Sequence, residues 1–487
     1  MTFVMRDSRR PTSGCRRQSS AFANPVGGSH GGGRAMSRIL YIGHVWPEPR
    51  SSAAGSRALA LLRTFSQAGW HITVASAAER GPRSEGLEGP DGLADETAAI
   101  VLNDSGFDRF VASAAPDVVV FDRFMIEEQF GWRVEQQCPG ALRVLDTVDL
   151  HCVRRVRQAL CGADDRGGAA GSSADKRDQR NQALEAALLR SDDAKREIAS
   201  ILRSDLTLVI SGYEIDLLTH CFGLAPELLH YLPFMISSER RGGLTESANA
   251  RLMALPPFEQ RRHFATIGNF MHPPNLDAFA WMRDAIWPLI RRALPQAELH
   301  VYGAYSPQAV EACDDPAAGL RIKGWAPDAH AALAAARVCL APLRFGAGLK
   351  GKIADAMVAG TPTVTTTVGA EGMGDGSPHD GSTASANGAA GASWCGAIAD
   401  DPQSIAAAAV ALHEDPQAWH RAQTSGFEII DQCFDAATHG RVLLDRIAVA
   451  RDERDTLRNR NFTGAMLRHH HHRATEFMAR WIEAKNR

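Results

Sequence analysis

The stretch ARVCLAPLRFGAGLKGKIADAMVAGTPTVTTTVGAEGM (336–373) decides the fold. It predicts a buried strand over 336–343, a glycine loop, and a helix that begins near Lys352 and ends near Gly360. Pro362 then leads into a new strand. Strand–loop–helix–strand order is typical of a parallel sheet with covering helices. The stretch therefore indicates an α/β protein with a glycine loop at the carboxyl end of a strand.

The same loop carries the strongest chemical signal. Gly346 and Gly348 allow backbone amides to approach an oxyanion, and a helix N-terminus adds partial positive charge. Lys350 and Lys352 add two full charges there, which suits a diphosphate. Asp355 lies three residues after Lys352, on the same helix face, where it could accept the hydroxyls of a ribose. An ordinary strand–helix turn with solvated lysines remains the alternative, because no Walker motif is present.

Apolar runs elsewhere extend the pattern to both halves of the chain. Strands are expected at 38–46, 70–76, 116–122, 141–149, 205–212, 263–269, 297–303, 319–325, 336–343 and 361–367. Helical spacing occurs at 51–69, 182–203 and 404–415, and at 275–294, where Pro288 should bend or split the helix. Two doubly wound parallel-sheet domains are therefore predicted, each Rossmann-like and binding ligands at the carboxyl ends of its strands across a shared cleft.

The predicted domain organisation follows from shifts in composition. We expect an extension without order at 1–35, followed by an acceptor-side domain at 36–235 that contains a surface insertion at 161–181. A linker at 236–262 leads to a nucleotide-binding domain at 263–445, which contains a low-complexity loop at 374–392. A helical tail follows at 446–487. The basic tail could pack back on the first domain or touch an anionic surface.

Composition narrows the function classes. The chain has 487 residues, 45% of them hydrophobic, and a formal net charge of −3, so no nucleic acid partner is expected. No run of 18 apolar residues occurs, and the nine cysteines include no CxxC pair. These features predict a cytoplasmic protein, with a peripheral contact at the inner membrane face as a further option.

The loop and helix resemble the donor site of GT-B glycosyltransferases of family 4, also described as glycosyl transferases group 1. The matching positions, in order, are Gly346, Gly348, Lys350, Lys352, Asp355, Ala356, Met357, Gly360, Pro362 and Val364. The weaker family pattern covers 38–445. Two positions depart from it: the family's pair of glutamates falls on Ala347 and Asp355, which weakens the expected contact to the donor sugar and shortens the reach to the ribose.

The resemblance implies further site residues. Those on the donor side are Gly268, Asn269, Gly324, Trp325 and Glu371, and those of the first helix loop are Gly55 and Ser56. The catalytic candidates are Asp149 and His151, which would face the reacting carbon, and Lys352, which would hold the phosphate. Several have a structural alternative: Trp325 could fill an interface, Gly55 and Ser56 could belong to a helix cap, and His151 could be structural.

The resemblance also implies a reaction. It predicts a retaining, metal-independent transferase of the hexosyltransferase type, active in glycan biosynthesis, with a nucleotide-diphosphate sugar as co-substrate and no cofactor. The acceptor would be a glycan, a lipid-linked molecule or another compound. Two alternatives stay open, namely a nucleotide-sugar epimerase of the same fold and a non-catalytic nucleotide-sugar-binding subunit.

Overall fold

The computed structural model describes residues 36–164, 173–237, 251, 254–374 and 394–486, with side chains left out over 163–178. The extension predicted at 1–35 and nearly all of the loop predicted at 374–392 lie outside these residues. None of the described helices is both long and apolar enough to cross a membrane.

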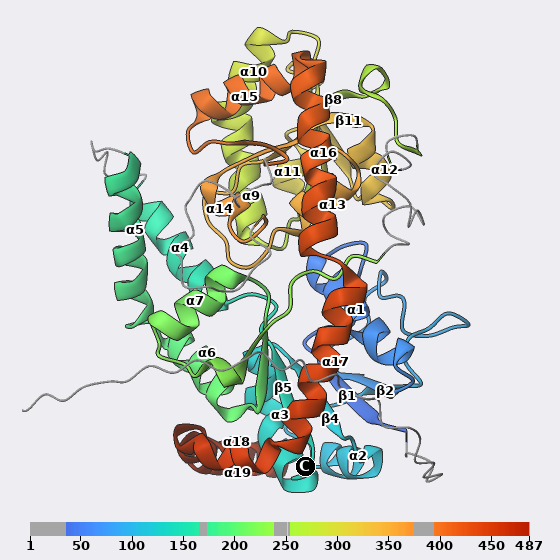
Figure 1. Ribbon diagram of the computed structural model, residues 1–487, viewed down its shortest axis with the longest axis vertical. Helices are drawn as coiled ribbons and strands as arrows, with labels where there is room; N and C mark the ends of the chain where they lie inside the picture. Colours follow the sequence, from blue (N-terminus) through green and yellow to red (C-terminus); the bar gives the residue numbers. More distant parts are fainter. Residues whose placement is uncertain (1–35, 165–172, 238–250, 252–253, 375–393, 487) are drawn as a thin grey trace, which may run out of the picture. The chain divides into compact units, whose positions relative to one another are not determined.

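Two parallel sheets organise the chain, one in each half (Figure 1). The N-terminal sheet has seven strands in the order β3-β2-β1-β4-β5-β6-β7. They are β1 Arg38–Gly43, β2 His71–Ser76, β3 Glu96–Ala99, β4 Val118–Asp122, β5 Leu142–Asp146, β6 Leu206–Val209 and β7 Leu229–Tyr231. The C-terminal sheet has six strands in the order β10-β9-β8-β11-β12-β13. They are β8 Arg262–Asn269, β9 Leu299–Ala304, β10 Leu320–Gly324, β11 Ala336–Ala341, β12 Thr363–Thr365 and β13 Gly396–Ile398.

Helices cover the sheets in both halves. In the N-terminal half they are α1 Ala53–Gln67, α2 Gly106–Ala114, α3 Phe124–Gln137, α4 His151–Asp164, α5 Ser173–Leu188, α6 Asp192–Arg203, α7 Gly212–His220 and a 3-10 turn at Pro226–Leu228. From the C-terminal half onward they are a 3-10 turn at Phe258–Gln260, α9 Pro273–Trp281, α10 Trp287–Ala293, α11 Gln308–Glu311, α12 Ala329–Ala334, α13 Gly351–Val358, α14 Thr367–Ala370, α15 Pro402–Glu414, α16 Pro416–Cys433, α17 Ala436–Asp452, α18 Arg454–Arg460 and α19 Phe462–Asn486.

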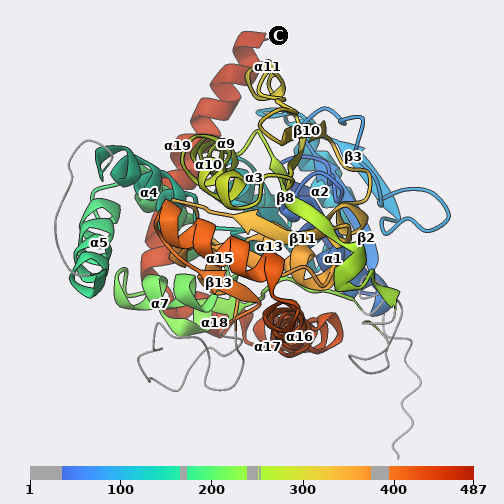
Figure 2. The same cartoon turned by 90° about the horizontal axis from the view of Figure 1, so that it is seen from above.

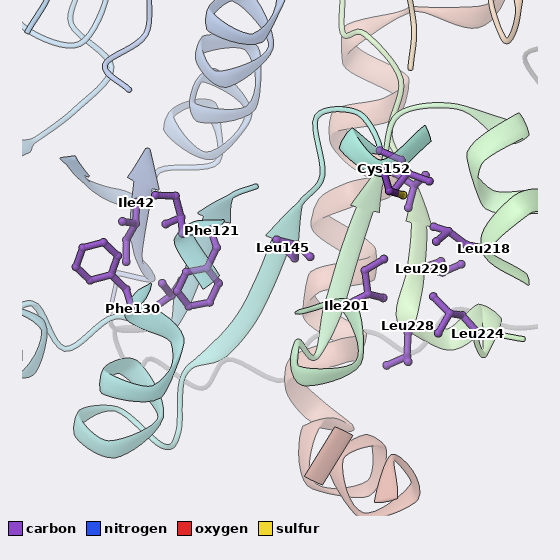
Figure 3. Packing of buried hydrophobic residues seen from close by; sticks show 14 of the residues in the cluster. Ile42, Phe121, Phe130, Leu145, Cys152, Ile201, Leu218, Leu224, Leu228 and Leu229 are labelled. Atoms are coloured by element: carbon purple, nitrogen blue, oxygen red, sulfur yellow. The ribbon is translucent and has the colours of Figure 1, made fainter. Parts of the chain in front are cut away.

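Alternation of side chains along the strands builds two cores on the N-terminal sheet. Leu40 and Ile42 of β1 face one core, which the neighbouring Phe121 and Phe130 help to fill (Figure 3). Ile39 and Tyr41 of the same strand face the opposite core, with side chains from α1 and α17. Burial on both faces explains why these strands are near-continuous apolar runs in the sequence.

All ten strands predicted from apolar runs are present, but three strands were missed. β3 (ETAA), β7 (LHY) and β13 (GAI) are three or four residues long and lack an apolar run. The helix predicted at 182–203 was wrong in extent, because α5 and α6 are separate helices and the Ser191 side chain accepts the amide of Ala194 to cap the second. The helix at 275–294 is split as expected, with a π-helical turn at Met282–Ile286 before Pro288.

The end of the chain returns to the N-terminal half. Figure 1 shows α16 beside elements of the C-terminal half and α17 beside α1. Where the chain crosses, the amide of Ile236 donates to the carbonyl of Phe434 at 2.8 Å. α19 packs against α3 and α6. The tail therefore packs back on the first domain, which was one of the two options from the sequence.

Candidate active site

The loop after β11 approaches the N-terminal half closely at Gly348. This residue has φ of 59°, in the left-handed region that favours glycine. A Cβ built on it would lie 2.8 Å from the Cβ of Asp149, which belongs to the loop between β5 and α4. The structure thus brings together the glycine loop and a candidate reacting-side carboxylate that the sequence places about 200 residues apart.

Lys352, in the first turn of α13, lies over the end of β8. Its Nζ donates to Oδ1 of Asn275 at 2.8 Å. A Cβ on Gly268 would stand 3.1 Å from that Nζ and 2.8 Å from Nδ2 of Asn275, so glycine leaves room for both side chains. Burial lowers the pKa of Lys352 to about 8. An ammonium group with a depressed pKa, held beside a glycine at the carboxyl end of a strand, is suited to an anionic ligand.

Lys350 has a different environment from Lys352. Its side chain is buried, and its Nζ donates to the carbonyl of Gly348 within the same loop. Burial also lowers the pKa of Lys350. In this structure Lys350 therefore stabilises the glycine loop from within, while Lys352 stands at its edge.

The amino ends of two helices meet beside this loop. Gly351 begins α13, and a Cβ built on it would lie 2.5 Å from the Cβ of Ala53, the first residue of α1. Ser52 caps α1 by accepting the amide of Gly55 at 3.0 Å. Helix N-termini carry partial positive charge and free amides, so both dipoles favour an anion at this place.

Gly55 and Ser56 hold the loop that precedes α1. A Cβ on Gly55 would come within 2.6 Å of the backbone of Glu48, and Ser56 Oγ donates to the carbonyl of Pro49 at 2.8 Å. These are the packing contacts of a helix start, which was the structural alternative for these two residues. The cap itself is Ser52, one turn earlier than the predicted pair.

The loop between β5 and α4 contains a strained residue. Val148 is β-branched and has φ of 62°, a conformation that costs energy and often marks functional sites. Asp149 pairs with Arg154, and His151 Nε2 lies 3.5 Å from Asp149 Oδ1. Burial lowers the pKa of His151 to about 3, so this imidazole is neutral near pH 7. The two predicted residues are thus adjacent, and only Asp149 also approaches the glycine loop.

Two of the remaining predicted residues, Asn269 and Trp325, contact the N-terminal half. Asn269 Nδ2 donates to the carbonyl of Ser51 at 3.3 Å, and the indole of Trp325 donates to the carbonyl of Arg50 at 3.3 Å. Gly324, just before Trp325, has φ of 69°. On α13, Asp355 Oδ1 lies 3.3 Å from His330 Nε2. Trp325 thus makes an interface contact here, one of its two predicted roles.

Sequence reasoning missed Arg157, which joins α4 to the C-terminal half. Its guanidinium donates to both carboxylate oxygens of Glu371 at 2.8 Å and to the carbonyl of Gly346 at 2.9 Å. Glu371 was predicted as a donor contact, but in this structure it is engaged by Arg157. The sequence does indicate a basic element here, because several arginines occur on α4 directly after a predicted strand. Which of these arginines reaches the glycine loop can be told only from the fold.

Glu214 was missed for a different reason. The run SGYE (211–214) reads as a capping box, in which the glutamate would turn back to its own helix start. Ser211 does cap α7, but Glu214 Oε1 instead accepts the amides of Leu150 and Gly348, both at 2.9 Å. Burial raises the pKa of Glu214 to about 8. One carboxyl group therefore ties the start of α4 to the glycine loop.

A possible metal-ligand group lies away from this site. His263, Glu298 and His300 bring one ligand atom each within 4.8 Å of one another. They stand at the amino ends of β8 and β9, whereas the glycine loop follows the carboxyl end of β11. Arg321 lies 3.7 Å from the Glu298 carboxylate, and Nδ1 of His263 accepts the backbone amide of Glu298. The Glu298 carboxylate and the His263 imidazole therefore already have partners. These three residues therefore take no part in the reaction considered for the glycine loop.

Comparisons with known proteins support the fold that the site implies. Residues 261–415 match the model of the family described as glycosyl transferases group 1. Sucrose-phosphate synthase from Thermosynechococcus elongatus superposes with a TM-score of 0.56 at 16% identity, covering 85% of this chain and 100% of that one. The fold is GT-B. A search of curated proteins finds no match for this sequence.

Other GT-B structures superpose over a similar extent. Anabaena HepE in complex with UDP-glucose has a TM-score of 0.56 at 12% identity and covers 85% of this chain and 99% of that one. WaaG, a glycosyltransferase involved in lipopolysaccharide biosynthesis, has a TM-score of 0.52 at 15% identity and covers 84% and 98%. The two sheets and their facing loops thus have the arrangement of this fold.

Proposed function

We propose that the protein is a retaining, metal-independent glycosyltransferase that moves a sugar from a nucleotide-diphosphate donor to a glycan, lipid-linked or other acceptor. The observation that carries the proposal is the position of Lys352 Nζ beside Gly268, with the amino ends of α13 and α1 adjacent. The family match over 261–415 and the UDP-glucose in the HepE structure support a nucleotide sugar as the donor.

The proposed roles follow from where charge develops. As the bond between the anomeric carbon and the diphosphate breaks, negative charge grows on the leaving oxygen. Lys352 and the amides at the start of α13 stabilise that charge more in the transition state than in the ground state. Asp355 receives the ribose hydroxyls, and Asp149 faces the reacting carbon. Because cationic side chains supply the electrostatic stabilisation, neither a metal ion nor a cofactor is required in this scheme.

The first experiment measures donor binding by the full chain. Thermal shifts with UDP, GDP, ADP and their sugars should identify one nucleotide family, since a ligand at 100 times its Kd adds about 2.7 kcal/mol. Lys352→Ala should remove that shift, whereas Lys323→Ala, an exposed lysine on β10, should keep it. No shift with any nucleotide, or an equal shift in Lys352→Ala, would overturn the assignment.

The second experiment separates transfer from the alternatives. Incubation with the selected donor and EDTA, followed by NMR of the products, should show slow hydrolysis or transfer with the anomeric configuration of the donor retained. Conversion of the donor alone into an epimer would identify the epimerase instead. Tight binding with no turnover above background would indicate the non-catalytic subunit, and inversion would exclude the retaining mechanism.

A further inference from the structure

The outer face of α19 exposes large apolar side chains to solvent. Phe462 is 76% exposed, Phe477 69% and Trp481 62%, and Met466 and Met478 are also exposed. These residues are three, four, eleven or fifteen positions apart in the sequence, and in an α-helix such spacings place most of their side chains on one side. Figure 2 shows the last turns of α19 extending past its neighbours. Apolar side chains gathered on one exposed helix face mark an interaction site.

The inner face of the same helix is fixed to the N-terminal half. Arg468 and His472 both pair with Glu135 of α3. A Cβ on Gly464 would collide with the carbonyl of Leu202, so the helix approaches the end of α6 closely. The apolar face is therefore held outward by contacts on its opposite side and cannot turn inward without breaking them.

The acidic and basic residues of α19 differ in their exposure to solvent. The acidic residues turn toward the N-terminal half, where Ser105 donates to Glu483 at 2.7 Å and Gln136 donates to Glu476 at 3.1 Å. The exposed charged residues of the helix are all cationic, namely Arg473, Arg480 and Lys485, and Arg480 also pairs with Glu476. The outer face thus combines aromatic and aliphatic groups with positive charge and carries no exposed carboxylate.

We propose that this face, defined by Phe462, Met466, Phe477, Met478 and Trp481 with Arg473, Arg480 and Lys485, binds the surface of an anionic lipid bilayer. Trp and Phe side chains partition into the headgroup region, and arginine and lysine beside them meet lipid phosphates. Each cation near an anionic surface adds to the attraction. The helix would lie in the plane of the interface rather than span the membrane.

A second copy of the chain fits this face less well. An isologous dimer would place the same surface against itself, so three cations would meet three cations, and among the described residues only Arg480 of the three pairs with an acid, Glu476. A lipid surface supplies the opposite charge and an apolar layer together. The proposal does not depend on the identity of the donor, because α19 contributes none of the site residues described above.

Vesicle sedimentation of the full chain tests the proposal. Binding to phosphatidylcholine vesicles containing phosphatidylglycerol should exceed binding to phosphatidylcholine alone at least tenfold and should weaken at high salt. Phe477→Ser/Trp481→Ser should lower binding tenfold or more. Arg473→Glu/Lys485→Glu should abolish the preference for the anionic lipid. Val101→Ser, which changes an apolar side chain that is 62% exposed in the N-terminal half, should bind like the wild type.

Two results would overturn the proposal. One is equal binding of the wild type and Phe477→Ser/Trp481→Ser. The other is a dimer, measured by sedimentation velocity, that dissociates in the same variant while vesicles bind neither form. Circular dichroism and the melting temperature show whether each variant is folded, and nucleotide binding, measured separately, should be unchanged in all of them. Failure of nucleotide binding would therefore concern the proposed transferase activity and not this surface.

Discussion

Arg157 and Glu371 form a bidentate ion pair between the two halves of the molecule, with two N–O distances of 2.8 Å. Arg157 belongs to α4 and Glu371 follows α14. Because the same guanidinium holds the carbonyl of Gly346, one side chain fixes two segments that surround the glycine loop. The contacts are largely buried, so water competes weakly for them.

Removing either partner of this pair should impair transfer. Hydrogen bonds to charged groups contribute about 1.5–3 kcal/mol, so Arg157→Met and Glu371→Gln should each lower kcat/KM roughly 10- to 150-fold. The double variant should lose little more than either single one, because both remove the same interaction. Arg155→Met, an exposed arginine of the same helix, serves as the control. Additive losses in the double variant would contradict a shared role.

Lys352→Ala should reduce turnover without unfolding the protein. Deleting one preorganised group that stabilises a developing oxyanion costs about 2–4 kcal/mol, or roughly 30- to 800-fold in kcat. The melting temperature should stay near the wild-type value, since burying this ammonium already costs free energy. Steady-state kinetics beside Lys323→Ala check the prediction. Normal turnover in Lys352→Ala would remove the lysine from the reaction.

Nucleotide affinity should weaken in alkaline solution. The pKa of Lys352 is about 8, so the free protein carries this charge below pH 8 and loses it above. The Kd for the nucleotide should therefore be nearly constant up to about pH 7, be roughly doubled at pH 8, and rise about tenfold for each further pH unit. Lys352→Arg keeps its charge throughout this range and should abolish the rise. Titration calorimetry measures both, and an identical pH profile for the two proteins would contradict the assignment.

Glu214 should make stability depend on pH with a definite sign. Its pKa is raised from 4.5 to about 8 in the folded protein, so the native state retains a proton that the unfolded state releases. This stabilisation is complete below pH 4.5 and is lost as the pH rises through 8. Glu214→Gln keeps an acceptor for the two amides and does not titrate. Urea unfolding from pH 5 to 8.5 should show a smaller decline in Glu214→Gln, and parallel declines would refute this.

Arg57 should be essential for stability rather than for chemistry. It is buried and bonds Asp146 through Nε and Nη2, while Nη1 donates to the carbonyls of Leu232 and Pro233. Removing one partner of a buried pair costs about 3–5 kcal/mol. Arg57→Met should therefore unfold at lower urea than Arg63→Met, which lies on the same helix. Equal midpoints would mean that the pair contributes nothing net.

The sequence predicts the sheets well because buried parallel strands leave long apolar runs. The glycine loop is also predictable, since Gly348, Lys350 and Lys352 stand together along the chain. Arg157 and Glu214 are not, because their role depends on a loop that lies 134 or more residues away in sequence and touches them only in the fold. Glu214 even carries a misleading local signal, the capping-box spacing, which a distant amide overrides.

The return of the chain to its first half has a consequence for synthesis. Leu443, Ile447 and Ala450 of α17 fill the same core as Ile39 and Leu61. A nascent chain that has emerged only as far as the second sheet still lacks α17, so this apolar face of the first sheet remains uncovered until α17 has been synthesised. The core of the first sheet would thus be completed after the second sheet has been synthesised, and a chaperone that shields apolar surface would have time to bind there.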